Sequence, residues 1–217
     1  MKRRRVAPGD AFMTKSLGPR PLFFPLPVVL IATYDKDGKV DVMNMAWEGS
    51  FGLNTVSFNL NPIRKTLANI RYSRAFTLSV ADVPHIKEVD YFGMVSGNTV
   101  EDKFERTGLK AERSRFVNAP ALVDFPLTFE CNVVSIDQEG NLVHIVGRIF
   151  NTLANERILD EYGNVDLAKI QGFYYNTFSS DYYSFGSRLG RSWSFGAELA
   201  KRSPPPPRQD TEQETQR

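Results

Sequence analysis

The chain has 217 residues, of which 41% are hydrophobic and 24% are charged, and its net charge is +2. This composition fits one globular domain with its own core, or two small ones, and excludes a chain that is disordered throughout. The single cysteine, Cys131, excludes an internal disulfide, and with only two histidines a Cys/His zinc site is not expected. The small net charge does not by itself indicate a nucleic-acid partner.

The two ends of the chain differ from its middle. Residues 1–15 begin with the basic run "KRRR", which no apolar segment follows, so we expect a flexible arm rather than a secretory signal. Residues 201–217 combine prolines with polar residues and are expected to form a disordered tail. No apolar run reaches the roughly 20 residues of a membrane span. We therefore predict a folded domain over residues 16–200, in the reducing cytoplasm, with no membrane or nucleic-acid partner.

The first predicted elements are strands. Residues 27–34, "PVVLIATY", form a β-branched run, and Asp37-Gly38 predicts a hairpin turn that leads into the second strand, "VDVMNMAW". Residues 54–60, "NTVSFNL", alternate between polar and apolar side chains and predict a third strand.

The next segment, "NPIRKTLANI" over residues 61–70, predicts a helix with Asn61 as its N-cap and Pro62 at its first position. Ile63, Leu67 and Ile70 are expected to share one face. The opening turn carries Arg64, Lys65 and Thr66, although cations oppose the helix dipole at this end. A bound phosphate would supply the missing negative charge and accept the helix N–H groups. The alternative is an ordinary solvated face.

The rest of the chain is also rich in predicted strands. A fourth strand is expected at residues 75–81, a helix from about Pro84 with Ile86, Val89 and Phe92 on one side, and a loop with a short helical piece at 94–108. Two long strands, 127–136 and 141–150, are joined by the four-residue turn "DQEG", and a short helix follows around "NERILDEY". Strands joined by hairpins favour a small antiparallel barrel with peripheral helices over a doubly wound parallel sheet. No Gly-rich dinucleotide fingerprint follows a strand.

Four stretches together resemble one known family. They are "PLPVVLIATYDKDGKVDVMNMAW", "NPIRKTLANI", "VSGNTVEDKFERTG" and "YYSFGSRLGRSWSFG". Their order and spacing over residues 20–196 resemble the flavin reductase-like FMN-binding split barrels, which include flavoredoxin. The resemblance implies a mainly β fold with peripheral helices, a six-stranded antiparallel Greek-key split barrel, and a homodimer with FMN near the dimer interface.

The resemblance also implies a set of cofactor-binding residues. Arg64, Lys65 and Thr66, with Asn61, would hold the FMN phosphate. The segment Asn44, Met45, Ala46 and Trp47 would lie along the isoalloxazine ring, although Met45 and Trp47 are equally well explained as core residues of a strand.

Lys103, in "EDKF", would reach the flavin ring or its ribityl chain and stabilise negative charge there. Ser96 and Gly97 would line the same pocket. The alternative for Lys103 is a solvated loop lysine. No metal ligand and no catalytic side chain is expected, and Cys131 is expected to be a small buried hydrophobe.

The aromatic segment from Phe173 to Phe195 has two possible roles, in which Tyr182, Tyr183 and Trp193 are the residues to test. These side chains would either shape the flavin and nicotinamide pocket or fill a dimer interface, where aromatic residues are enriched.

These observations favour an FMN-dependent oxidoreductase, an NAD(P)H:flavin reductase that transfers hydride from NADH or NADPH to bound flavin. Electrons would then pass to free flavin, a redox partner protein, iron or oxygen. One alternative is a flavoredoxin-like electron carrier without nicotinamide activity, and another is a barrel that serves only as an interaction module.

Overall fold

The computed structural model describes residues 16, 18–19, 25–46, 48–50 and 52–200, so the predicted arm and tail lie outside the described residues. The chain divides between Phe185 and Gly186 into two compact units, which we describe separately. The second unit contains the short helix α3 (Ala197–Ala200). Within the described residues, no helix is long and apolar enough to cross a membrane.

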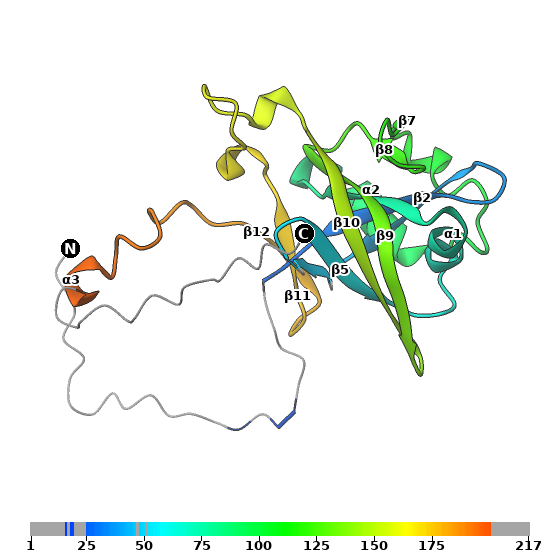
Figure 1. Ribbon diagram of the computed structural model, residues 1–217, viewed down its shortest axis with the longest axis horizontal. Helices are drawn as coiled ribbons and strands as arrows, with labels where there is room; N and C mark the ends of the chain where they lie inside the picture. The colour runs from blue at the N-terminus through cyan, green and yellow to red at the C-terminus, as the bar shows by residue number, and fades with distance from the viewer. Residues whose placement is uncertain (1–15, 17, 20–24, 47, 51, 201–217) are drawn as a thin grey trace, which may run out of the picture. The chain divides into compact units, whose positions relative to one another are not determined.

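The first unit is built on a curled antiparallel sheet (Figure 1). Its strand order is β3-β2-β6-β9-β10-β5-β4. Its strands are β2 (Val29–Tyr34), β3 (Val40–Met45), β4 (Glu48–Ser50), β5 (Thr55–Leu60), β6 (Ala75–Val80), β9 (Leu127–Glu139) and β10 (Leu142–Ala154). Six of these strands are long and the seventh, β4, has only three residues. The predicted mainly β fold, an antiparallel split barrel, is therefore confirmed.

Two small sheets and two helices complete the first unit. The sheets are β1 (Leu26–Pro27) with β11 (Phe173–Asn176) and β12 (Asp181–Ser184), and β7 (Ala111–Arg113) with β8 (Pro120–Leu122). Helix α1 (Lys65–Ser73) packs against β2, β3 and β6, and α2 (Ile86–Met94) packs against β3. Short 3-10 turns lie at Val83–His85, Glu105–Thr107, Glu156–Ile158 and Leu167–Lys169.

Strand β2 lies between two hydrophobic clusters, which explains its continuous apolar sequence. Val29 and Ile31 point into one cluster, together with Leu67 and Ile70 from α1. The alternate residues Val28, Leu30 and Ala32 point into the other, with Val89 and Phe92 from α2. Because successive side chains on a strand face opposite sides, burial of both faces requires apolar residues at every position. Cys131 is fully buried in the first cluster, as predicted.

Several predicted boundaries are wrong. Helix α1 begins at Lys65, three residues later than the predicted first position, Pro62, and Ile63 is exposed rather than on the buried helix face. The β9–β10 turn contains only Gly140 and Asn141, because Glu139 pairs with Leu142. The helix expected around "NERILDEY" is a single 3-10 turn.

Glu48 is the buried carboxylate with the largest expected effect of pH on stability. It pairs with the core residue Phe58 across β4 and β5, and cross-strand partners share one face of a sheet. Burial raises the pKa of Glu48 to about 8, and only its own backbone N–H acts in the opposite direction.

Between pH 4.5 and about 8, folded Glu48 therefore keeps a proton that the unfolded chain has lost. The free energy of unfolding should fall as pH rises across this window, because the unfolded state binds fewer protons there. Denaturant titrations at several pH values should show that the free energy of unfolding falls less steeply with pH in Glu48→Gln than in wild type. Replacement of the exposed Glu101, in Glu101→Gln, should leave the wild-type dependence on pH unchanged. An identical slope in wild type and Glu48→Gln would contradict this assignment.

Candidate functional site

Two neighbouring cavities bring the predicted site residues together. The larger, of about 350 Å³, is lined by Val28, Met43, Asn44, Met45, Ala46, Asn59, Leu60, Asn61, Arg64, Tyr175 and Tyr182. The smaller, of about 40 Å³, is lined by Asp41, Met43, Asn44, Arg64, Lys65, Thr66, Phe92, Gly93, Val95, Ser96, Gly97 and Lys103. Met43, Asn44 and Arg64 belong to both. Every predicted cofactor-binding residue lines one or both cavities except Trp47, which lies outside the described residues.

The end of β3 forms the wall between the cavities. This strand is at the edge of the main sheet, so one row of its backbone N–H and C=O groups is not used by sheet pairing. Asn44 and Ala46 are half-buried there, while Met45 both lines the larger cavity and packs into the core cluster. Met45 is therefore a core residue that also forms part of the cavity wall, and its contact with a flavin ring stays a prediction.

Arg64 lies at the junction of the cavities because of the turn that precedes α1. The Asn61 side chain accepts a hydrogen bond from the backbone N–H of Ile63 at 3.1 Å, and the Arg64 N–H donates to the Asn61 carbonyl. Asn61 thus closes a turn and is not the helix cap that was predicted. The N-cap is Arg64, without a side-chain capping bond, and no acidic residue follows in the first turn.

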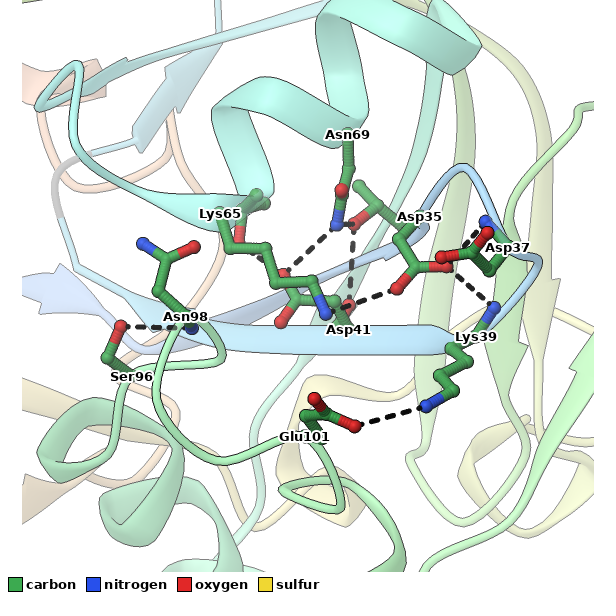
Figure 2. Close-up of polar contacts among 11 residues, drawn as sticks. Asp35, Asp37, Lys39, Asp41, Lys65, Asn69, Ser96, Asn98 and Glu101 are labelled. Carbon is green, nitrogen blue, oxygen red and sulfur yellow. Dashed lines mark hydrogen bonds and ion pairs between the residues drawn. The ribbon is translucent and has the colours of Figure 1, made fainter.

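The other two residues predicted to bind phosphate already have acidic partners (Figure 2). Lys65 Nζ lies 3.2 Å from the Asp35 carboxylate, and the Thr66 hydroxyl donates to Asp41 Oδ2 at 2.9 Å. Within the described residues, no ion pair involves the Arg64 guanidinium. Arg64 is therefore the cation of this cluster that is available to an external anion.

Asp41 is the residue of this site that the sequence analysis missed. It is only 4% exposed, and besides Thr66 it accepts a hydrogen bond from Asn69 Nδ2 at 3.3 Å. A Cβ atom at Gly97 would collide with Asp41 Oδ1, so this glycine lets the loop after α2 approach the carboxylate. The available signal was an acidic residue between Val40 and Val42 inside a predicted strand.

Lys103 is a buried lysine, not the solvated loop residue of the alternative reading. The residue is only 5% exposed. The ammonium group donates a hydrogen bond to the Phe92 carbonyl at 2.9 Å and lies 5.5 Å from the centre of the Phe92 ring. Burial lowers its pKa to about 8; Asp41 acts in the opposite direction, while Arg64 and Lys65 lower it further. Lys103 therefore contributes positive charge to the smaller cavity at neutral pH.

The aromatic β11–β12 hairpin divides its tyrosines between two faces. Tyr175 and Tyr182 line the larger cavity, and the Tyr182 hydroxyl donates to Asp90 at 2.9 Å. Burial and the Asp90 carboxylate raise the pKa of Tyr182 to about 12, so it is neutral at physiological pH. Tyr183 instead stacks on Tyr174, with ring centres 5.7 Å apart, and is exposed. Trp193 belongs to the second unit and is exposed.

The side-chain inventory of the site differs from that of metal or hydrolytic centres. Among the described residues, no three His, Cys, Asp or Glu side chains gather as metal ligands. Among the described residues that line the larger cavity, only Arg64, Tyr175 and Tyr182 have ionisable side chains. A cavity with mixed polar and apolar walls and two tyrosines, beside a cationic cavity, suits a flat ring that carries an anionic group.

Comparison with known proteins places this chain in one family. Residues 21–176 match the model of the flavin reductase like domain. The chain therefore belongs to the flavin reductase like domain family.

Individual relatives agree with this assignment. Flavoredoxin of Desulfovibrio vulgaris (Miyazaki F) is 30% identical, with 85% of this chain and all of that chain covered and a TM-score of 0.80. Flavoredoxin from Methanosarcina acetivorans shares the fold at 22% identity, with a TM-score of 0.77 over 86% of this chain and all of that chain. An uncharacterized protein of Aquifex aeolicus (strain VF5) is 25% identical over 174 residues, which cover 74% of this chain and 84% of that protein.

Proposed function

We propose that this protein binds FMN in the two joined cavities and acts as an NAD(P)H:flavin reductase, which takes hydride from a nicotinamide and passes electrons to an acceptor. The observation that carries the proposal is the junction at Asn44 and Arg64. There an aromatic cavity large enough for a flat ring meets a cationic cavity at the start of a helix.

The residues present fit FMN. The larger cavity has the volume of a typical ligand site, and its walls are a strand edge on one side and two tyrosines on the other. The Arg64 guanidinium and the N-terminus of α1 offer charge-assisted donors to a phosphate. Solved relatives of this fold include an FMN-binding protein from Thermus thermophilus, which supports the same ligand class.

Each part of the chain then has a physical task. FMN, when bound, supplies a ring that can accept hydride and release electrons to an acceptor. Asn44, Met45 and Ala46 would position the ring, Tyr175 and Tyr182 would shield it from water, and Lys103 would favour negative charge near it. Because the ring carries the redox chemistry, these residues act through position and electrostatics, and no catalytic acid or base is required.

The proposal includes a homodimer. Large hydrophobic side chains remain exposed along the first unit's two longest strands, and their burial against a second copy of the chain would be favourable. They are Val134 on β9 and Leu142, Phe150 and Leu153 on β10.

A second candidate function is that of an FMN-binding electron carrier without nicotinamide activity. The 30% identity to a flavoredoxin over that protein's whole length favours it. The two functions differ in whether a nicotinamide reduces the bound flavin directly.

The test is to mix FMN-loaded protein with NADH or NADPH in the absence of oxygen and to follow the visible absorption of the flavin. A reductase should lose this absorption within seconds with at least one nicotinamide. Loss only after a chemical reductant or a reduced partner protein is added would favour the carrier. If purified protein takes up no FMN, both candidates are wrong.

A further inference from the structure

A buried carboxylate lies inside the cluster of cations proposed to hold the phosphate. Asp41 lines the smaller cavity together with Arg64, Lys65 and Lys103. A negative side chain at an anion site opposes the ligand, and a buried charge is costly to retain unless it is well paired.

The fold fixes this carboxylate in place. Its Oδ2 atom accepts from Thr66 and from Asn69, and the Asn69 amide also donates to Thr33 at 3.0 Å. Thr33 is the cross-strand neighbour of Asp41 in the β2–β3 pair. On the other side, the backbone at Gly97 approaches Oδ1 closely. Asp41 therefore cannot turn into solvent without breaking this network (Figure 2).

The charges around the cavity leave little excess for a phosphate. Arg64, Lys65 and Lys103 are opposed by Asp41 and by Asp35, the partner of Lys65, so one net positive charge remains. A phosphate monoester carries about −1.5 to −2 charges at neutral pH. The net positive charge of the site is therefore smaller than the negative charge of a phosphate monoester, although the site contains three cations.

We propose that Asp41 is an internal counter-ion that sets the selectivity of this site: it weakens the hold on the flavin phosphate and keeps FMN exchangeable. This inference rests on the proposed function. On this inference FMN binds and dissociates, as a reductase with a flavin substrate requires. Asp41 is then a specificity-determining residue.

The test compares FMN with riboflavin, which lacks the phosphate, in wild type, Asp41→Asn and Asp37→Asn. Asp37 lies on the same hairpin but is exposed, so its replacement controls for loss of a negative charge that water screens. Dissociation constants are measured by flavin fluorescence, and thermal unfolding checks that each variant is folded. Asparagine keeps the shape of aspartate and can still accept the Thr66 hydrogen bond.

We expect Asp41→Asn to tighten FMN binding by about tenfold, since one nearby repulsive charge is removed. Riboflavin binding should change by less than about twofold, because no phosphate is present. Asp37→Asn should change neither. An FMN affinity in Asp41→Asn that is unchanged or weaker overturns the proposal.

A wild-type measurement keeps the proposal testable if Asp41→Asn does not fold. The phosphate should then improve binding by no more than about tenfold over riboflavin, because the cluster has only one net positive charge; a larger preference overturns the proposal. If wild type binds neither flavin, the proposed function itself fails. If wild type binds both and Asp41→Asn leaves the FMN preference unchanged, only the role of Asp41 is wrong.

Discussion

Arg64→Ala is expected to weaken FMN binding by about tenfold, the equivalent of about 1.4 kcal/mol, which is close to the lower end of the range for hydrogen bonds to a charged group. Arg64 lines both cavities and, among the described residues, is in no ion pair. Lys65 and Thr66 are already engaged by Asp35 and Asp41, so Lys65→Ala should have a smaller effect.

Riboflavin separates a phosphate effect from damage to the whole site. The affinity of riboflavin for Arg64→Ala should stay close to that for wild type, because the proposed partner of Arg64 is the phosphate, which riboflavin lacks. The matched control is Arg71→Ala on the same helix, because Arg71 is exposed and donates to Gln138 at 2.9 Å. Equal losses of FMN and riboflavin affinity in Arg64→Ala would show that Arg64 shapes the ring cavity instead. The measurement is a fluorescence titration of both flavins.

Much of the fold follows from local patterns in the sequence. Three elements were predicted from residues that are adjacent in the sequence: β2 from its apolar run, the hairpin from the Asp37-Gly38 turn, and β5 from its alternation. Each depends only on the residues of one strand or one tight turn. The start of α1 was misplaced because Asn61-Pro62 can open either a helix or a turn. In the structure, the turn is also held by Asn98, from another part of the chain, whose amide donates to the Ile63 carbonyl.

The site was predictable only as a set of segments. The strand end at Asn44 and the loop at Lys103 were predicted from resemblance, and the helix start at Arg64 was predicted both from its cations and from resemblance. The structure brings the three together. Asp41 was missed because a strand pattern does not reveal that its neighbours will be Thr66 and Asn69, which lie 25 and 28 residues further along the chain. Tyr182 and Tyr183 were separated only when the β11–β12 pairing determined which of them lines the cavity.

The largest expected effect on stability concerns the contact between Phe76 and Gly147 inside the barrel. Phe76 is fully buried and packs edge-to-face on Phe58, with ring centres 5.1 Å apart. Phe76→Ala should lower the free energy of unfolding by about 3–5 kcal/mol, because it leaves a cavity in the core. The exposed Phe116 provides the control, and Phe116→Ala should stay within about 0.5 kcal/mol of wild type.

Gly147 makes this prediction more specific. It lies beside a bulge in β10, and a Cβ atom there would collide with the Phe76 ring, with Cε1 only 2.8 Å away. Gly147→Ala should therefore cost about 1–3 kcal/mol through overpacking. In the Phe76→Ala background the same methyl group would enter the new cavity, so its cost should vanish or reverse. Denaturant unfolding of the two single variants and the double variant measures this coupling. Additive losses of stability would mean that glycine is needed at position 147 for the backbone bend of β10, and not to make room for the ring of Phe76.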